Sequence, residues 1–278
     1  MDTVLTPQQL AHFETFGFLL LPKAFSTDEM AAFTRAAEEL WEQDSTTEAN
    51  EEVRLGYFVE RNPVLSQLVT DDRIYPVIEE LMGPEFIWVG SEGNVSNRSV
   101  VKWHPDRKYY REGEGHWIDF RQVKVMMYLE PLTRETGCLR VIPGSHRIDD
   151  GYAKLLQESA GKNEAVFGLD GPDLPAVSVE TEPGDIVVFN HNLKHASFGG
   201  NARRRMFTMN LCQHCEAESE LESLKQRIGL HARYLNDKMH SDAMRETGPS
   251  ERMHHLQQVI ENEGHLPKLV RQEREKRD

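Results

Sequence analysis

The feature that most restricts the fold is a change of pattern at about residue 85, where short apolar runs begin to alternate with turn-forming residues. The runs are Phe86–Val89, Val123–Leu129, Leu139–Ile142, Ala176–Val179, Ile186–Phe189 and Met206–Cys212. Between them lie Thr136–Gly137, Pro143–Ser145 and Glu182–Asp185, whose glycine, proline and polar residues favour chain reversal. Short strands with frequent turns predict antiparallel sheets that fold as a sandwich or a barrel.

Helical segments are expected before this β-rich region. Thr6 and Ser26 each precede a helical pattern and are followed three residues later by Gln or Glu, the signature of an N-terminal capping box. Between the two, the apolar run Phe16–Pro22 suits a buried strand that ends at a proline. We therefore expect residues 1–84 to be mostly helical.

The pattern changes again after the β-rich region. Residues 216–278 carry the mixed charges of solvated helix faces, and we interpret them as helices that pack on the core or form a homodimer interface. A polar, glycine-containing stretch at residues 147–175 is interpreted as an insertion and as a candidate lid over the mouth of a barrel. Together these features favour one domain over residues 1–278, with a β core at residues 85–215.

Composition and charge exclude several classes of partner. Lys and Arg total 32 and Asp and Glu total 46, a net charge of -14 that would repel nucleic acids and anionic membrane surfaces. No run approaches the roughly 20 apolar residues that span a bilayer, and Met1–Val4 lacks the order of a secretion signal. The three cysteines are too few for a disulfide framework, and Cys212–Cys215 lacks a second pair that would complete a zinc site. We expect a soluble, cytoplasmic protein.

Three residues stand out as candidate metal ligands: His104, Asp106 and His195. In an extended segment, residues i and i+2 project on the same side, so His104 and Asp106 can share one ion. His195 follows an apolar strand and should lie where that strand reaches the barrel mouth. Two imidazoles and one carboxylate leave coordination positions open, as in non-haem Fe(II) oxygenases, which suggests a catalytic site.

Each part of this pattern has an ordinary alternative. His104 and Asp106 could belong to a surface turn in which the carboxylate accepts a local hydrogen bond. A second His-x-Asp triplet, His240–Asp242, lies in the helical tail, where residues i and i+2 point in different directions and cannot converge. The other histidines near the candidate site are interpreted as ordinary polar or half-buried residues: His116, His146 and His191.

Three consecutive arginines, Arg203–Arg205, stand at the entrance to the run Met206–Cys212. At least one of them must belong to a basic turn. An inward-facing guanidinium one strand away from the metal could bind a carboxylate bidentately, which a dicarboxylate cosubstrate would require. Arg204 is the first candidate for this role and Arg205 the second.

Taken in order along the chain, these residues resemble the phytanoyl-CoA dioxygenase-like family of Fe(II)- and 2-oxoglutarate-dependent oxygenases. The resemblance covers most of the chain and rests on the order and spacing of short motifs. These motifs are Phe13–Phe18, Trp103–Asp106, Gly137–His146, Pro183–Phe189, His195–Ser197 and Arg204–Arg205.

The resemblance implies a mainly β fold with flanking helices, a double-stranded β-helix or cupin-like jelly-roll barrel with iron at its open end. It implies that His104, Asp106 and His195 are the iron ligands and that Arg204 or Arg205 binds 2-oxoglutarate. It also implies an enzyme that uses O2 to hydroxylate a C–H bond of a small molecule and releases succinate and CO2. Because related halogenases lack the carboxylate ligand, Asp106 favours hydroxylation, desaturation or a related oxidation.

Two other functions stay open at this point. One is a jelly-roll metal-binding module without turnover, and the other is a cupin-type metal-dependent enzyme that does not use 2-oxoglutarate. The intact ligand set argues against the first, and the candidate carboxylate-binding arginine argues against both.

The substrate is less constrained by the sequence. Basic and aromatic residues near the proximal ligands form either a pocket rim for a small anionic metabolite or a solvated loop balanced by Glu112 and Glu114. They are Lys102, Arg107, Lys108, Tyr109, Tyr110 and Arg111. Asn94, Trp117 and Ser197 lie where pocket residues are expected, without an assigned role.

Overall fold

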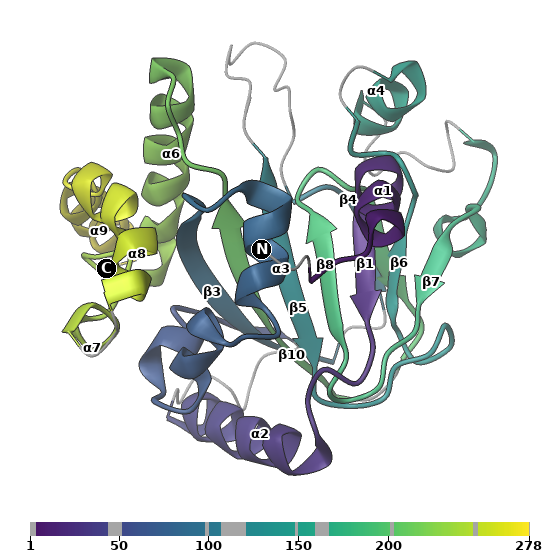
Figure 1. Ribbon diagram of the computed structural model, residues 1–278, viewed down its shortest axis with the longest axis horizontal. Coiled ribbons are helices and arrows are strands. Elements are labelled where there is room, and N and C mark those ends of the chain that lie inside the picture. The colour runs from purple at the N-terminus through teal and green to yellow at the C-terminus, as the bar shows by residue number, and fades with distance from the viewer. Residues whose placement is uncertain are drawn as a thin grey trace.

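Two antiparallel sheets face each other at the centre of the fold (Figure 1). The computed structural model describes residues 4–43, 52–97, 100–106, 121–147, 150–158, 167–200, 203–246 and 250–277. The larger sheet, in the order β1-β8-β5-β10-β3-β2, consists of β1 (Phe18–Leu21), β8 (Ile186–Asn190), β5 (Gln122–Tyr128), β10 (Arg204–Cys212), β3 (Ile87–Ser96) and β2 (Glu52–Gly56). The smaller sheet, in the order β4-β9-β6-β7, consists of β4 (Val100–His104), β9 (His195–Phe198), β6 (Leu139–Val141) and β7 (Val177–Val179). The predicted antiparallel β core is confirmed.

The larger sheet is buried on both faces because its strands alternate between two environments. On β5, Val123, Val125 and Met127 belong to the core shared with the N-terminal helices. Met126 and Tyr128, one residue out of phase, belong to a second apolar cluster that includes residues of the smaller sheet. We call these two sides the outer face and the inner face of the larger sheet. A side chain's position in this alternation therefore decides whether it meets the helices or the space between the sheets.

Helices cover the outer face and one side of the barrel. The N-terminal helical elements are α1 (Pro7–Phe16), α2 (Thr27–Glu42), η1 (Val59–Arg61), η2 (Leu65–Thr70) and α3 (Tyr75–Met82). The C-terminal ones are α6 (Glu218–Leu230), η4 (His231–Tyr234), α7 (Asp242–Glu246), α8 (Ser250–Asn262) and α9 (Leu266–Glu275), which gather beside β3 in Figure 1. None of the helices in the described ranges is long and apolar enough to cross a membrane.

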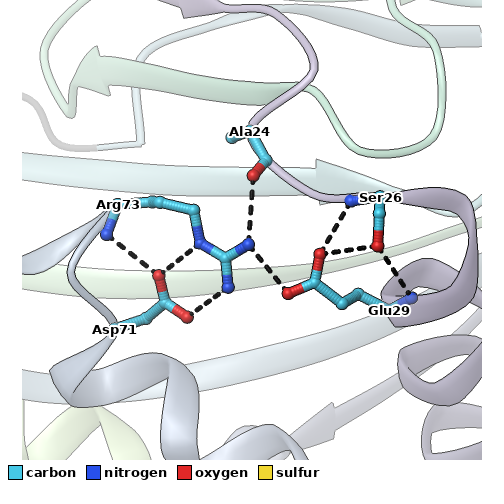
Figure 2. Close-up of polar contacts among 5 residues, drawn as sticks. All are labelled: Ala24, Ser26, Glu29, Asp71 and Arg73. Carbon is cyan, nitrogen blue, oxygen red and sulfur yellow. Dashed lines mark hydrogen bonds and ion pairs between the residues drawn. The ribbon is translucent and has the colours of Figure 1, made fainter.

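The predicted helix starts are confirmed in atomic detail. At α1, Thr6 Oγ1 accepts from the Gln9 amide and the Gln9 side chain accepts from the Thr6 amide. At α2, Ser26 and Glu29 form the same reciprocal capping box. Figure 2 shows that Glu29 also bonds Arg73, with Nη1 to Oε1 at 2.8 Å, so the cap ties α2 to the segment before α3.

The described part of the insertion at residues 147–175, the candidate lid, packs against the smaller sheet. A role as a lid stays a prediction. The described part contains α4 (Gly151–Glu158) and η3 (Gly171–Asp173). One apolar cluster joins it to the smaller sheet and contains Trp103, Leu156, Leu174, Ala196 and Phe198. Ala196 and Phe198 alternate with His195 on β9 and so point away from the space between the sheets. The apolar residues of the insertion are buried against the face of the smaller sheet that points away from the larger sheet.

Two strands lie where the sequence gave no strand prediction. β2 joins the larger sheet at its edge, beside β3, within a region expected to be mostly helical. β9 contains only four residues and begins at His195 itself. The tail triplet also differs in detail from the prediction: His240 is fully buried and precedes α7, whereas Asp242 begins α7 and pairs with Lys238.

Candidate metal and carboxylate site

β4 and β9 bring the predicted histidines side by side. The two strands pair antiparallel, and His104 lies directly opposite His195 in their register, with ring centroids 4.4 Å apart. Asp106 follows the end of β4 after Pro105, and its Oδ1 lies 3.9 Å from His195 Nε2. One potential ligand atom from each residue lies within 4.8 Å of the others. The three side chains singled out in the sequence therefore gather about a common point.

The orientation of both imidazoles suits metal binding. His104 Nδ1 lies 2.7 Å from the Lys102 carbonyl oxygen, and His195 Nδ1 lies 2.8 Å from that of Leu193. Because a carbonyl oxygen only accepts, each Nδ1 must carry the proton and donate it. Each Nε2 then keeps its lone pair for a metal ion, with the ring held by a backbone acceptor.

Lys124 contributes a charge that the sequence analysis did not foresee. It projects from the inner face of β5, is 8% exposed, and places Nζ 2.7 Å from Asp106 Oδ2. Burial opposes ionisation of Asp106, but Lys124 and the neighbouring imidazoles hold the pKa of this carboxyl well below its usual range. Burial, together with His104, lowers the pKa of His195 to about 4. At neutral pH the site thus offers an ionised carboxylate and a neutral imidazole, the forms that bind metal ions.

The two candidate arginines lie on opposite faces of β10. Arg204 is on the inner face, 7% exposed, and its Nη1 donates to the Gly137 carbonyl at 2.8 Å and to Ser197 Oγ. Its Nε is buried and has no hydrogen-bond partner in the described part of the chain. Ser197 lies two residues after His195 on β9, so both side chains point to the same side. Arg204 therefore presents a partly unsatisfied guanidinium on the same interior space as the histidines.

Arg205, in contrast, is bound on the outer face. Its Nη1 pairs with Glu38 Oε1 of α2 at 2.5 Å, and its Nε pairs with Glu130 Oε2 at 3.1 Å. These two carboxylates balance the charge of Arg205, so the side chain does not need a bound ligand. Arg203 pairs with Glu38 as well and is the half-exposed member of the three.

Several other candidates resolve into ordinary roles or fall outside the described residues. His146 and His191 are both buried and lie outside the group of potential ligands around His104. Cys212 and Cys215 are buried free thiols, and the described residues place no metal-binding cluster there. Asn94 is buried on the inner face of β3 with Oδ1 unpartnered. The candidates outside the described residues are Arg107, Lys108, Tyr109, Tyr110, Arg111, Glu112, Glu114, His116 and Trp117.

Fold and geometry together define a class of protein. Two imidazoles and one carboxylate at the end of a two-sheet β barrel form the arrangement that non-haem iron oxygenases use, with coordination positions left for small ligands. The buried Arg204, on β10 of the facing sheet, adds a candidate site for an anionic group.

Comparison with known proteins gives this class a family. Residues 13–206 match the family model described as phytanoyl-CoA dioxygenase (PhyH). The chain therefore belongs to the phytanoyl-CoA dioxygenase family, which confirms the predicted resemblance and the predicted class of enzyme, a dioxygenase. The match ends at β10, so helices α6 to α9 lie outside it.

Individual relatives and solved structures agree with this assignment. An ectoine dioxygenase from Sphingopyxis alaskensis is 27% identical over 221 residues, which cover 71% of this chain and 72% of the relative. A probable phytanoyl-CoA dioxygenase from Caenorhabditis elegans is 22% identical and covers 70% of each chain. The structure of HygX from Streptomyces hygroscopicus with iron bound has a TM-score of 0.62 at 22% identity, covering 77% of this chain and 89% of that one. EctD from S. alaskensis with 2-oxoglutarate and 5-hydroxyectoine has a TM-score of 0.58 at 23% identity, covering 76% and 77%. The jelly-roll fold predicted from the sequence is confirmed.

Proposed function

We propose that this protein is an Fe(II)- and 2-oxoglutarate-dependent oxygenase that hydroxylates an unactivated C–H bond of a small metabolite and releases succinate and CO2. The observation that carries the proposal is the convergence of His104, Asp106 and His195, with potential ligand atoms within 4.8 Å of one another. Solved structures of the same fold support it, because HygX binds iron, or nickel together with 2-oxoglutarate, and EctD binds 2-oxoglutarate.

The triad is proposed to hold the ferrous ion. Its donors are two Nε2 atoms, freed by the backbone bonds of each Nδ1, and the carboxylate of Asp106. Lys124 fixes Oδ2 of that carboxylate and leaves Oδ1 on the side of His195. When bound, the ferrous ion and 2-oxoglutarate supply the electrons that activate O2 for insertion of one oxygen atom into a C–H bond.

Arg204 is proposed to bind the distal carboxylate of 2-oxoglutarate. Residues two apart on a strand are separated by roughly 7 Å, so Ser197 lies about the length of a five-carbon dicarboxylate away from His195. Ser197 Oγ contacts Arg204, and the remaining donors of the guanidinium are suited to a carboxylate. Arg205 is unsuited to the role because Glu38 and Glu130 already bind it.

The geometry does not favour either alternative function. A binding module without turnover has no use for a buried, partly unpartnered arginine beside an open metal site, and neither has a cupin-type enzyme that works without an oxoacid. Relatives at 22% to 27% identity include both ectoine and phytanoyl-CoA dioxygenases, so relatedness alone does not specify the substrate.

Succinate formation tests this function directly. The purified protein is incubated with Fe(II), ascorbate and 2-oxoglutarate in air, and succinate and O2 uptake are measured. We expect succinate above the level formed by His104→Ala, with the excess abolished by EDTA or by removal of O2. Iron bound to the protein without any excess succinate would contradict the proposal, and metal-dependent oxidation that does not need 2-oxoglutarate would favour the cupin-type alternative.

A further inference from the structure

Among the residues that the structure describes, Arg227 is a buried cation with no ion-pair partner. It lies on α6, is 6% exposed, and donates a hydrogen bond from Nη1 to Gln122 Oε1 at 3.1 Å. Its Nε is buried and has no hydrogen-bond partner, and no ion pair involves it in the described part of the chain. An isolated buried guanidinium is costly unless another group satisfies its charge and its donors. Consistent with this, burial lowers the pKa of Arg227.

Gln122 has an unsatisfied donor beside the same guanidinium. It is 1% exposed, its Oε1 accepts from Arg227, and its Nε2 is buried with no hydrogen-bond partner among the described residues. The two side chains together therefore present N–H donors from adjacent groups, and each lacks an acceptor. A group that only accepts, and that carries negative charge, would satisfy both side chains.

The position of this pair connects it to the candidate metal site. Gln122 precedes Lys124 by two residues on β5, so both side chains lie on the inner face of the larger sheet. Lys124 in turn bonds Asp106 at 2.7 Å. The carboxylates of Asp106 and Glu92 are among the charges that act on Arg227. Gln122 therefore lies two residues along β5 from Lys124, the residue that pairs with Asp106 of the candidate triad.

The nearby carboxylates are already occupied. Glu92 Oε1 accepts from Arg233 Nη2 at 2.9 Å and from Tyr234 Oη at 2.6 Å, both contributed by η4. Asp106 is bound to Lys124 and faces the histidines. Neither carboxylate forms a hydrogen bond with Arg227, so no carboxylate in the described part of the chain satisfies this guanidinium.

We infer that Arg227 and Gln122 form a subsite that binds a carboxylate of the substrate beside the metal-binding triad. The inference rests on the proposed function, which places the reacting C–H bond at the triad. A guanidinium edge and an amide N–H together match the planar acceptor pattern of a carboxylate. Arg227 lies on α6, beyond the part of the chain that matches the family model.

Thermal unfolding with acetate as the probe tests the subsite without turnover. All proteins carry Arg204→Met, so that acetate cannot bind at the other buried arginine of the inner face. Sodium acetate is compared with sodium chloride at equal ionic strength. We expect acetate to raise the Tm of the parent protein and to have no such effect after Arg227→Met. Arg203→Met, which removes a half-exposed arginine, is the matched control and should keep the acetate response.

A second variant covers the case in which Arg227→Met does not fold. Gln122→Glu places a carboxylate of the same size beside Arg227, and the resulting ion pair should raise the Tm in chloride and remove the acetate response. A response to acetate that persists in either variant would overturn the inference. So would a lower Tm of Gln122→Glu in chloride, because it would show that Arg227 needs no anion.

The substrate itself supplies the last test. A metabolite panel is scored by substrate-stimulated O2 uptake, and each carboxylate is paired with its primary amide. We expect stimulation by carboxylates only, with the KM of the best substrate raised about 100-fold in Arg227→Met. Equal stimulation by the amides would overturn the inference. Absence of succinate formation by the unmodified protein would instead count against the proposed function, and the acetate result would stand independently of it.

Discussion

The inner and outer faces of the larger sheet are built from the same strands but differ in the side chains they present and in the contacts these side chains make. On the outer face, Val123, Val125 and Phe207 pack into the core formed with the N-terminal helices. On the inner face, Lys124 pairs with Asp106, and Arg204 contacts Ser197. In the described part of the chain, the inner face carries buried polar atoms that have no hydrogen-bond partner, among them Arg204 Nε and Gln122 Nε2.

This difference separates stability from function within single strands. Arg205 and Arg204 are neighbours, yet the first is bound by two carboxylates, whereas Nε of the second has no hydrogen-bond partner among the described residues. A buried unpartnered donor destabilises the folded state, so its presence needs a compensating use, such as a ligand. We therefore expect substitutions on the outer face to lower stability and those on the inner face to lower activity.

The largest effect is expected at His104 on the inner side. His104→Ala should reduce succinate formation to the assay background, because the metal would lose one of its three protein ligands. The Tm of the metal-free protein should change by no more than about 2 °C, since an open site contributes little to folding. His254→Ala, which removes an exposed histidine paired with Glu85, is the control and should keep full activity. Retained turnover in His104→Ala would contradict the expectation that activity depends on the residues of the inner side.

The outer face is tested at Phe207. This side chain is fully buried in the core, with its ring 6.2 Å from that of Phe58. Phe207→Ala should reduce the free energy of unfolding by about 3–5 kcal/mol, measured by chemical denaturation. The folded fraction at low temperature should keep its KM for 2-oxoglutarate. A loss below about 1 kcal/mol would show that the outer face is not the main source of stability.

The two arginines of β10 give the sharpest test of the contrast. Arg204→Met should raise the KM for 2-oxoglutarate by about 10- to 100-fold, because a charge-assisted contact to its distal carboxylate is lost. Arg205→Met should leave this KM unchanged and cost about 1 kcal/mol of stability through its ion pairs. Steady-state kinetics and denaturation of both variants decide the matter. The reverse pattern would indicate that 2-oxoglutarate binds at Arg205 on the outer face.

Acid should produce a smaller effect, through histidines that are buried in neutral form. The pKa of His195 is lowered to about 4 and that of His240 to about 3, in both cases chiefly by burial. In the unfolded chain these imidazoles bind a proton near pH 6.5, whereas in the folded protein they stay neutral to a lower pH. Their contribution to the free energy of unfolding is therefore fully present above pH 6.5 and is lost as the pH falls towards about 4. Each histidine should contribute a loss of about 2 kcal/mol between pH 7 and pH 5.

Variants and metal loading separate the two contributions. His240→Leu should remove about half of the expected acid sensitivity of the metal-free protein. Added Ni(II) should shift only the contribution of His195, because His240 lies outside the group of potential ligands. Denaturant unfolding across this pH range checks both statements, and unchanged pH dependence in His240→Leu would refute the assignment.

The sequence was sufficient to predict the barrel and the triad because both depend on local patterns. Alternating apolar runs predict strands, and an extended His-Pro-Asp segment places His104 and Asp106 on one side. It did not predict β9 as a strand, because this segment is short and contains no β-branched residue. β2 escaped prediction because Glu52 and Arg54 make an edge strand look like a solvated segment.

The choice between Arg204 and Arg205 depends on a register of one residue. A signal for it exists in β10, where Arg204 is in phase with Thr208 and Asn210 and Arg205 with Phe207 and Met209. Polar residues of this strand line the inner face, so phase alone favours Arg204. Arg227 gives no comparable signal, because only the packing of α6 brings it beside Gln122, 105 positions earlier in the chain.

Gly137 lies at the centre of the proposed carboxylate site although it belongs to a turn. Its backbone has φ of 97°, and its carbonyl oxygen accepts from both Ser197 and Arg204. A β-carbon there would come within 3.3 Å of Arg204 Nη1 and 3.1 Å of the Gly199 carbonyl. A larger residue would therefore push against the guanidinium, and we expect Gly137→Ala, like Arg204→Met, to raise the KM for 2-oxoglutarate. The turn between β5 and β6, which connects the two sheets, would thus help to set where an organic acid can be held.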